Sequence, residues 1–100
     1  MEIPAGPIPS LPRGVTASEG TLVSEIGGEA VLLHLDSEQY FGLDEVGARM
    51  WQILTTSDSV QRAFEQMLED WDVEPDRLRG DLVNLIEQLR ANGLVNVCAA

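Results

Sequence analysis

The chain has 100 residues, of which 44% are hydrophobic, so we expect one folded domain with one core and not global disorder. Seventeen acidic residues against six basic ones give a formal net charge of −11, which disfavours nucleic-acid binding because that affinity comes largely from Lys and Arg. The sequence contains neither an apolar run of the roughly 18 residues that a membrane span needs nor a secretory signal, so we expect a cytoplasmic protein that does not bind a membrane.

Residues that carry chemistry are sparse. Cys98 is the one cysteine and His34 the one histidine, so an internal disulfide is excluded and a metal site is not expected. The carboxylates are scattered, and no nucleophile motif or phosphate-binding glycine loop occurs. We therefore expect a protein that is not an enzyme and needs no cofactor.

The first 20 residues differ from the rest of the chain. Four of the five prolines lie here, at Pro4, Pro7, Pro9 and Pro12, and proline removes backbone donors and blocks helix. We expect residues 1–20 to form a proline-rich, partly disordered arm. The folded domain is expected at residues 21–97.

Three strands are predicted next, at residues 21–26, 30–35 and 39–43. Gly27 and Gly28 suit a tight turn because both tolerate positive φ, and residues 36–38 (DSE) form a polar turn. Short connections between consecutive strands predict a three-stranded antiparallel meander. Its third strand has no obvious later partner, so we expect that strand to have a free edge.

Three helices follow the strands. Asp44 is a good N-cap for a helix at residues 45–54, and a second helix is predicted at residues 60–71. Pro75 suits the first position of a third helix at residues 75–92, and Gly93 ends it. Residues 94–97 form either a short final strand or a packed tail. The predicted fold is α+β and winged helix-turn-helix-like, with a three-stranded antiparallel sheet followed by three helices.

The third helix shows two apolar groups. Leu78, Leu82, Leu85 and Leu89 form a stripe that predicts a core face. Beside this stripe, a semi-polar flank is formed by Arg79, Val83, Ile86 and Arg90. A broad core face with ordinary surface arginines and one wall of a binding groove both fit this flank.

The third predicted strand offers a second wall. Unpaired N–H and C=O groups at a strand edge can accept an extended peptide as a further strand, although most edges bind nothing. The candidate peptide-binding residues therefore come from this strand and the third helix: Gln39, Tyr40, Phe41, Gly42, Leu43, Arg79, Leu82, Val83, Ile86 and Arg90.

The chain resembles the PqqD-like family. The resemblance rests on residues 28–35 (GEAVLLHL) and 40–51 (YFGLDEVGARMW), with residues 71–73 (WDV) and 89–94 (LRANGL) later in the same order, and it covers about residues 21–95. Such proteins are recognition elements for ribosomally made, modified peptides. The resemblance implies that the leader of a precursor peptide adds a strand to residues 39–43 and lies against the third helix.

The resemblance also implies a partner, which is a processing enzyme that receives the leader. Residues 40–51 are more similar to the members that serve lasso peptide pathways and deliver the leader to a protease. The alternative within the family is a peptide chaperone for a radical enzyme in quinone cofactor synthesis.

A function outside the family is an acidic winged-helix regulator that binds DNA or another regulator. Acidic residues crowd the turn between the second and third helices, where a recognition helix needs basic surroundings. These residues are Glu65, Glu69, Asp70, Asp72, Glu74 and Asp76.

Overall fold

The protein is described by a computed structural model of residues 11–98, and the part of the predicted arm at residues 1–10 lies outside this range. The elements follow one another in the order β1 (Gly14–Ala17), β2 (Thr21–Ile26), β3 (Glu29–His34), β4 (Gln39–Leu43), α1 (Glu45–Thr56), α2 (Val60–Asp70), α3 (Pro75–Ala91) and β5 (Val95–Cys98). The predicted α+β fold, with a three-stranded meander followed by three helices, is confirmed.

The meander is the sheet β2-β3-β4, and both of its pairings are antiparallel. Gly27 and Gly28 connect β2 to β3 with φ angles of 59° and 88°, a conformation that costs glycine little. Leu32 of β3 lies opposite Val23 of β2 and Phe41 of β4, and its side chain is fully buried. The face that contains this row is therefore the face that packs on the helices.

A second sheet differs from the sequence prediction. Gly14–Ala17, which falls within the predicted arm, forms β1 and pairs antiparallel with β5. The physical reason is burial: Val15 lies in the core, and β5 supplies backbone partners that the arm was expected to lack. Of the two alternatives for residues 94–97, the structure shows the strand, at Val95–Cys98.

The helices begin where their capping residues predict. Asp44 Oδ1 accepts a hydrogen bond from the Gly47 N–H at 2.8 Å, and Ser59 Oγ accepts one from the Arg62 N–H at 3.1 Å. Pro75 opens α3, and Gly93 follows it with a φ of 73°. Helix α1 ends at Thr56, two residues beyond the predicted end at Leu54.

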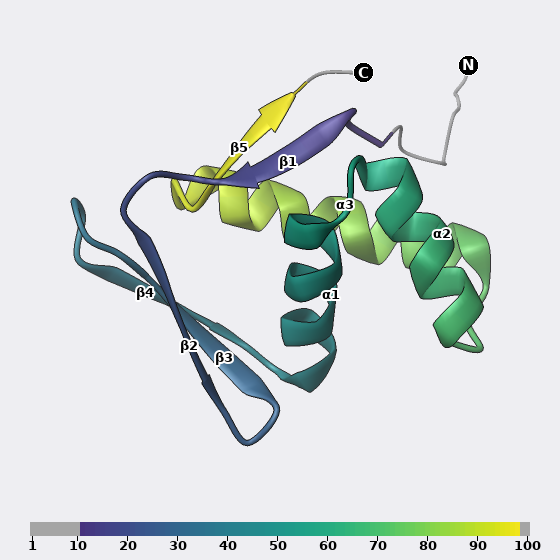
Figure 1. Cartoon of the computed structure of the whole chain (residues 1–100), viewed down its shortest axis with the longest axis horizontal. Coiled ribbons are helices and arrows are strands. Elements are labelled where there is room, and N and C mark those ends of the chain that lie inside the picture. Colours follow the sequence, from purple (N-terminus) through teal and green to yellow (C-terminus); the bar gives the residue numbers. More distant parts are fainter. Residues whose placement is uncertain (1–10, 99–100) are drawn as a thin grey trace, which may run out of the picture.

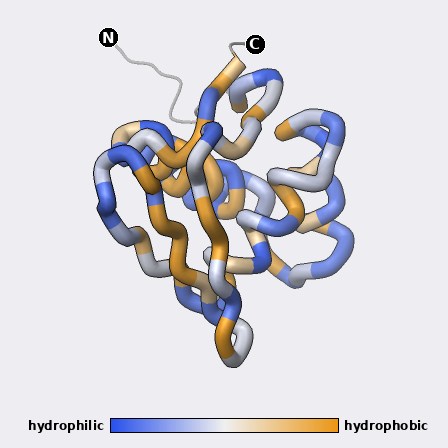
Figure 2. The backbone as a smooth tube through the Cα atoms, turned by 60° about the vertical axis from the view of Figure 1, so that its left-hand side comes forward, coloured by the Kyte–Doolittle hydropathy of each residue, from blue (hydrophilic) through white to orange (hydrophobic). Residues whose placement is uncertain are grey.

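The core lies where α1 stands between the three-stranded sheet and α2, with α3 running behind α1 (Figure 1). Hydrophobic and hydrophilic residues alternate along much of the backbone (Figure 2), and every element except β2 contributes buried residues to this core. Its most buried large side chains are Leu32, Val60, Met67, Leu78, Leu82, Ile86, Leu89 and Leu94. None of the helices within residues 11–98 combines the length and apolar character needed to cross a bilayer.

Candidate functional site

The outer edge of β4 carries no neighbouring strand within the described residues, since β4 pairs with β3 alone. Leu43 is buried and Phe41 packs partly against the core, whereas Tyr40 on the other face is 73% exposed. Gln39 and Gly42 are also exposed. The five predicted strand residues therefore come together on one edge whose backbone groups are free to accept a further strand.

The five predicted residues of α3 have other surroundings. Leu82 and Ile86 are core residues with exposed fractions of 0% and 2%. The guanidinium carbon of Arg79 lies 4.8 Å from the centre of the Phe64 ring, so this arginine stacks on α2. Val83 is half-buried. Arg90 donates a hydrogen bond to Glu87 Oε1 at 2.7 Å, and this bond, helped by charge attraction, lowers the pKa of Glu87 and raises the pKa of Arg90.

A hollow of about 250 Å³ lies between the first turns of α1 and the middle of α3. Because α1 begins directly after β4, this hollow lies near the carboxyl end of β4, although no residue of Gln39–Leu43 lines it. None of the five predicted α3 residues lines it. Its lining combines three apolar, two acidic and two amide side chains with a glycine: Val46, Met50, Leu85, Asp44, Asp81, Asn84, Gln88 and Gly47.

The lining residues of α3 were missed by the sequence analysis. Asp81, Asn84, Leu85 and Gln88 follow one another at steps of three, one and three residues, which places them on one stripe of the helix at about 100° per residue. By the same geometry Arg79, Val83 and Arg90 lie on the opposite side of the buried leucine face. The spacing of these four residues indicates one stripe of α3, but the sequence does not show which flank of α3 faces the first turns of α1.

The hollow is negatively charged and has an apolar floor. Met50 is buried and presents little area, whereas Leu85 is half-buried and Val46 is 56% exposed. Asp44 is held by its capping bond to Gly47. Asp81 is exposed, and no hydrogen bond or ion pair to its carboxylate occurs among residues 11–98. No arginine lines the hollow.

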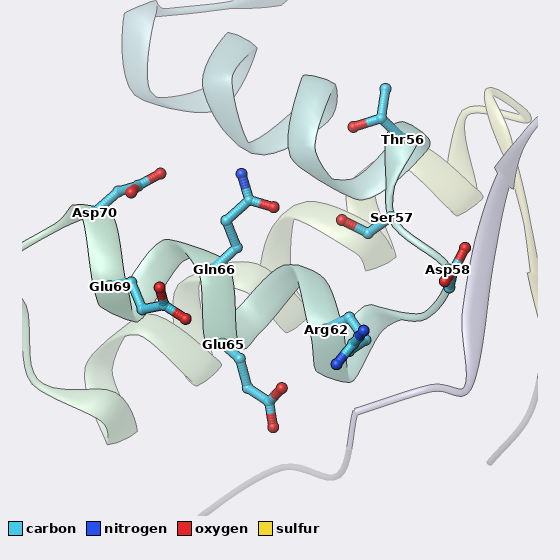
Figure 3. A pocket seen from close by; sticks show the side chains of 8 residues that line it. All are labelled: Thr56, Ser57, Asp58, Arg62, Glu65, Gln66, Glu69 and Asp70. Carbon is cyan, nitrogen blue, oxygen red and sulfur yellow. The ribbon is translucent and has the colours of Figure 1, made fainter.

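A larger hollow of about 560 Å³ lies beside α2 and the end of α1 (Figure 3). Asp58, Glu65, Glu69 and Asp70 line it together with one basic residue, Arg62. Figure 3 shows Glu65 and Asp70 pointing in different directions, so they do not form an acid–base pair. Within residues 11–98, no three His, Cys, Asp or Glu side chains gather closely enough to hold a metal ion.

Comparison with known proteins bears on the free edge. A family model described as coenzyme PQQ synthesis protein D (PqqD) matches residues 29–95, from the start of β3 to the first residue of β5. No curated protein matches the sequence.

Two solved structures share the fold. One is TbiB1 in complex with the TbiA(beta) leader peptide, at a TM-score of 0.76 and 28% identity, covering 81% of this chain and 94% of TbiB1. The other is lasso peptide synthetase B1 complexed with the leader peptide, at a TM-score of 0.73 and 22% identity, covering 82% of this chain and 96% of that one. Both proteins hold a peptide in the described complexes.

Proposed function

Because the chain belongs to the PqqD family, we propose that it binds the leader segment of a ribosomally made precursor peptide. The observation that carries this proposal is the likeness to TbiB1, which was solved with a leader peptide bound. The match covers 94% of the TbiB1 chain. The protein binds the leader without catalysis and presents it to a processing enzyme. In lasso peptide maturation, the favoured pathway, that enzyme is a protease that removes the leader.

The leader binds by adding an antiparallel strand to β4. The free backbone groups of Gln39–Leu43 supply the hydrogen bonds, which any extended peptide can form. Exposed Gly42 has nothing within 4 Å of the position of an added Cβ, so a second backbone can approach closely. Selectivity must then come from side chains next to this edge.

The hollow between α1 and α3 supplies that selectivity. An apolar leader side chain in contact with Val46, Met50 and Leu85 gains about 1.5–3 kcal/mol if it becomes fully buried. Two or three such anchors along the peptide give roughly micromolar affinity after the cost of association. Leu82 and Ile86 support this wall from within the core and do not contact the leader. Arg79, Val83 and Arg90 lie outside the contact.

A pair of variants on one helix tests the groove. Leu85→Asp places a charge in the hollow and is expected to weaken leader binding tenfold or more, since about 1.4 kcal/mol corresponds to a factor of ten. Val83→Asp is the matched control, because Val83 is also half-buried on α3 but lies on the opposite flank. Its affinity is expected to equal that of the unmodified protein.

The measurement is isothermal calorimetry with a synthetic leader segment of a short precursor identified among the neighbouring genes. Circular dichroism verifies that both variants keep their helices. Equal loss of affinity in the two variants, or no loss in Leu85→Asp, would remove the hollow from the binding site. The absence of any binding to the unmodified protein would contradict the function itself.

The proposal places the protein in the cytoplasm and assigns it no catalytic step. Precursors that ribosomes make arise in the cytoplasm, and a chain with one cysteine suits a reducing compartment. The acidic side chains around the hollow beside α2 do not converge on a common point, which supports a binding role over catalysis.

A second candidate function is delivery of a peptide to a radical enzyme in quinone cofactor synthesis. The description of the matching family, coenzyme PQQ synthesis protein D, favours it. Neighbouring genes separate the two. A protease and an ATP-dependent cyclase beside a short precursor indicate the lasso pathway, whereas a radical enzyme indicates the quinone pathway.

A further inference from the structure

We propose that the hollow between α1 and α3 selects leaders in which a Lys or Arg lies close to the apolar side chain that enters it, and that Asp81 is the residue that recognises this charge. The inference rests on the proposed function and specifies the chemistry of its ligand. It depends on three features of the hollow: the apolar floor, the one-sided charge of its rim and the spacing between Asp81 and Leu85.

The first feature fixes where the apolar side chain lies. Val46, Met50 and Leu85 are the apolar lining residues, and Met50 is flexible enough to fit side chains of different shape. An aliphatic or aromatic anchor in contact with these three residues covers surface that is open to water in the free protein.

The second feature is the charge of the rim. Asp44 and Asp81 are both negative, and no basic side chain lines the hollow to compensate them. The Asp44 carboxylate already accepts a hydrogen bond at the positive end of α1, which offsets part of its charge. Asp81 has no such partner within residues 11–98. It is therefore the carboxylate that a peptide cation gains most by approaching.

The third feature is geometric. Asp81 and Leu85 are four residues apart on α3, which corresponds to about 6 Å along the helix axis. Side chains two residues apart in an extended peptide point to the same side and are about 6.6 Å apart. A peptide anchored on Leu85 thus brings the residue two positions away beside Asp81. The long flexible stem of Lys or Arg tolerates the angle between strand and helix.

The net charge of −11 adds a long-range preference of the same sign. An acidic leader is repelled by the whole molecule and by the rim, whereas a cationic leader is attracted by both. Since Asp81 is exposed, the local pair is worth only about a two- to fivefold change in affinity. That change is sufficient to rank otherwise similar peptides.

The test selects binders from a displayed library of random twelve-residue peptides on three proteins. The unmodified protein is expected to enrich peptides with an apolar residue and a Lys or Arg one or two positions away. Asp81→Lys is expected to lose this preference and to enrich Asp or Glu there. Glu69→Lys changes the net charge equally at the exposed face of α2, so it should retain the preference of the unmodified protein.

Calorimetry on one enriched peptide completes the test. Its affinity for Asp81→Lys is expected to be about two- to fivefold lower at 50 mM salt, with a smaller difference at 500 mM salt. A basic preference that persists in Asp81→Lys, or apolar anchors without neighbouring cations, would overturn this inference while leaving leader binding intact. If no enriched peptide is weakened by Leu85→Asp, the hollow is not the binding site and this inference fails, whereas the proposed function fails only if the unmodified protein does not bind a leader.

Discussion

Neighbouring residues of α3 have different roles: some support the fold and others are accessible to a ligand. Leu82 and Ile86 have exposed fractions of 0% and 2%, whereas Leu85 between them is half-buried and borders the hollow. A peptide that docks on the surface reaches Leu85 but not the other two. Substitutions at these neighbouring positions therefore have different consequences.

Leu82→Ala is expected to lower the free energy of unfolding by about 2–5 kcal/mol, because it leaves a cavity among fully buried side chains. Chemical denaturation measures the change. Gln88→Ala at an exposed position of the same helix is the control, and its stability should stay near that of the unmodified protein. A loss below 0.5 kcal/mol for Leu82→Ala would be incompatible with the packing of α3.

The sequence identified most of the buried face of α3, but it placed Leu85 in that face and Ile86 beside it, whereas Ile86 is buried and Leu85 is half-buried. It did not identify the flank that lines the hollow beside α1. The spacing of Leu78, Leu82 and Leu89 predicts their burial, since a buried helix face has apolar residues at three- and four-residue intervals. A flank of mixed polarity carries no comparable signal. Which flank approaches a given strand depends on how α3 rotates against α1 and α2, and tertiary packing decides that rotation.

At the scale of elements, local structural signals can be predicted from the sequence, whereas long-range strand pairing cannot. The turn at Gly27-Gly28, the cap Asp44 and the helix-opening Pro75 act over two or three residues, so the sequence revealed β2, β3, β4 and the starts of α1 and α3. The pairing of β1 with β5 joins residues more than 75 positions apart, as in the register of Ala17 with Val95. No local pattern encodes such a pairing.

Val15→Asp is expected to lower the free energy of unfolding by about 2–3 kcal/mol, because it places a charge among core side chains. Thr16→Asp, the next residue of β1, is exposed and should have little effect. Thermal unfolding followed by circular dichroism compares the two. Similar midpoints for both variants would show that β1 does not belong to the folded unit.

At the scale of the whole molecule, acidic residues far outnumber the basic residues that could compensate their charge. The chain carries seventeen acidic and six basic residues, and Arg90 with Glu87 is the one salt bridge that joins two of residues 11–98. Both partners of that pair are exposed, so it contributes little. Repulsion among carboxylates is then the main electrostatic effect on folding.

Salt is therefore expected to stabilise the protein. Raising NaCl from 20 mM to 200 mM shortens the range of charge repulsion, and the melting temperature should rise by a few degrees. Differential scanning fluorimetry measures this shift. A melting temperature that falls with salt would mean that attractive ion pairs dominate after all.

The β1–β5 pairing also brings two segments from far apart in the sequence side by side. Gly14 lies opposite Cys98, so these two residues sit about 5 Å apart, on the side of the molecule away from the β2–β3 turn (Figure 1). The polypeptide thus enters β1 and leaves β5 at neighbouring points. Such an arrangement suits insertion into a loop of a host protein, or circular permutation through a short linker, with the free edge of β4 left unobstructed.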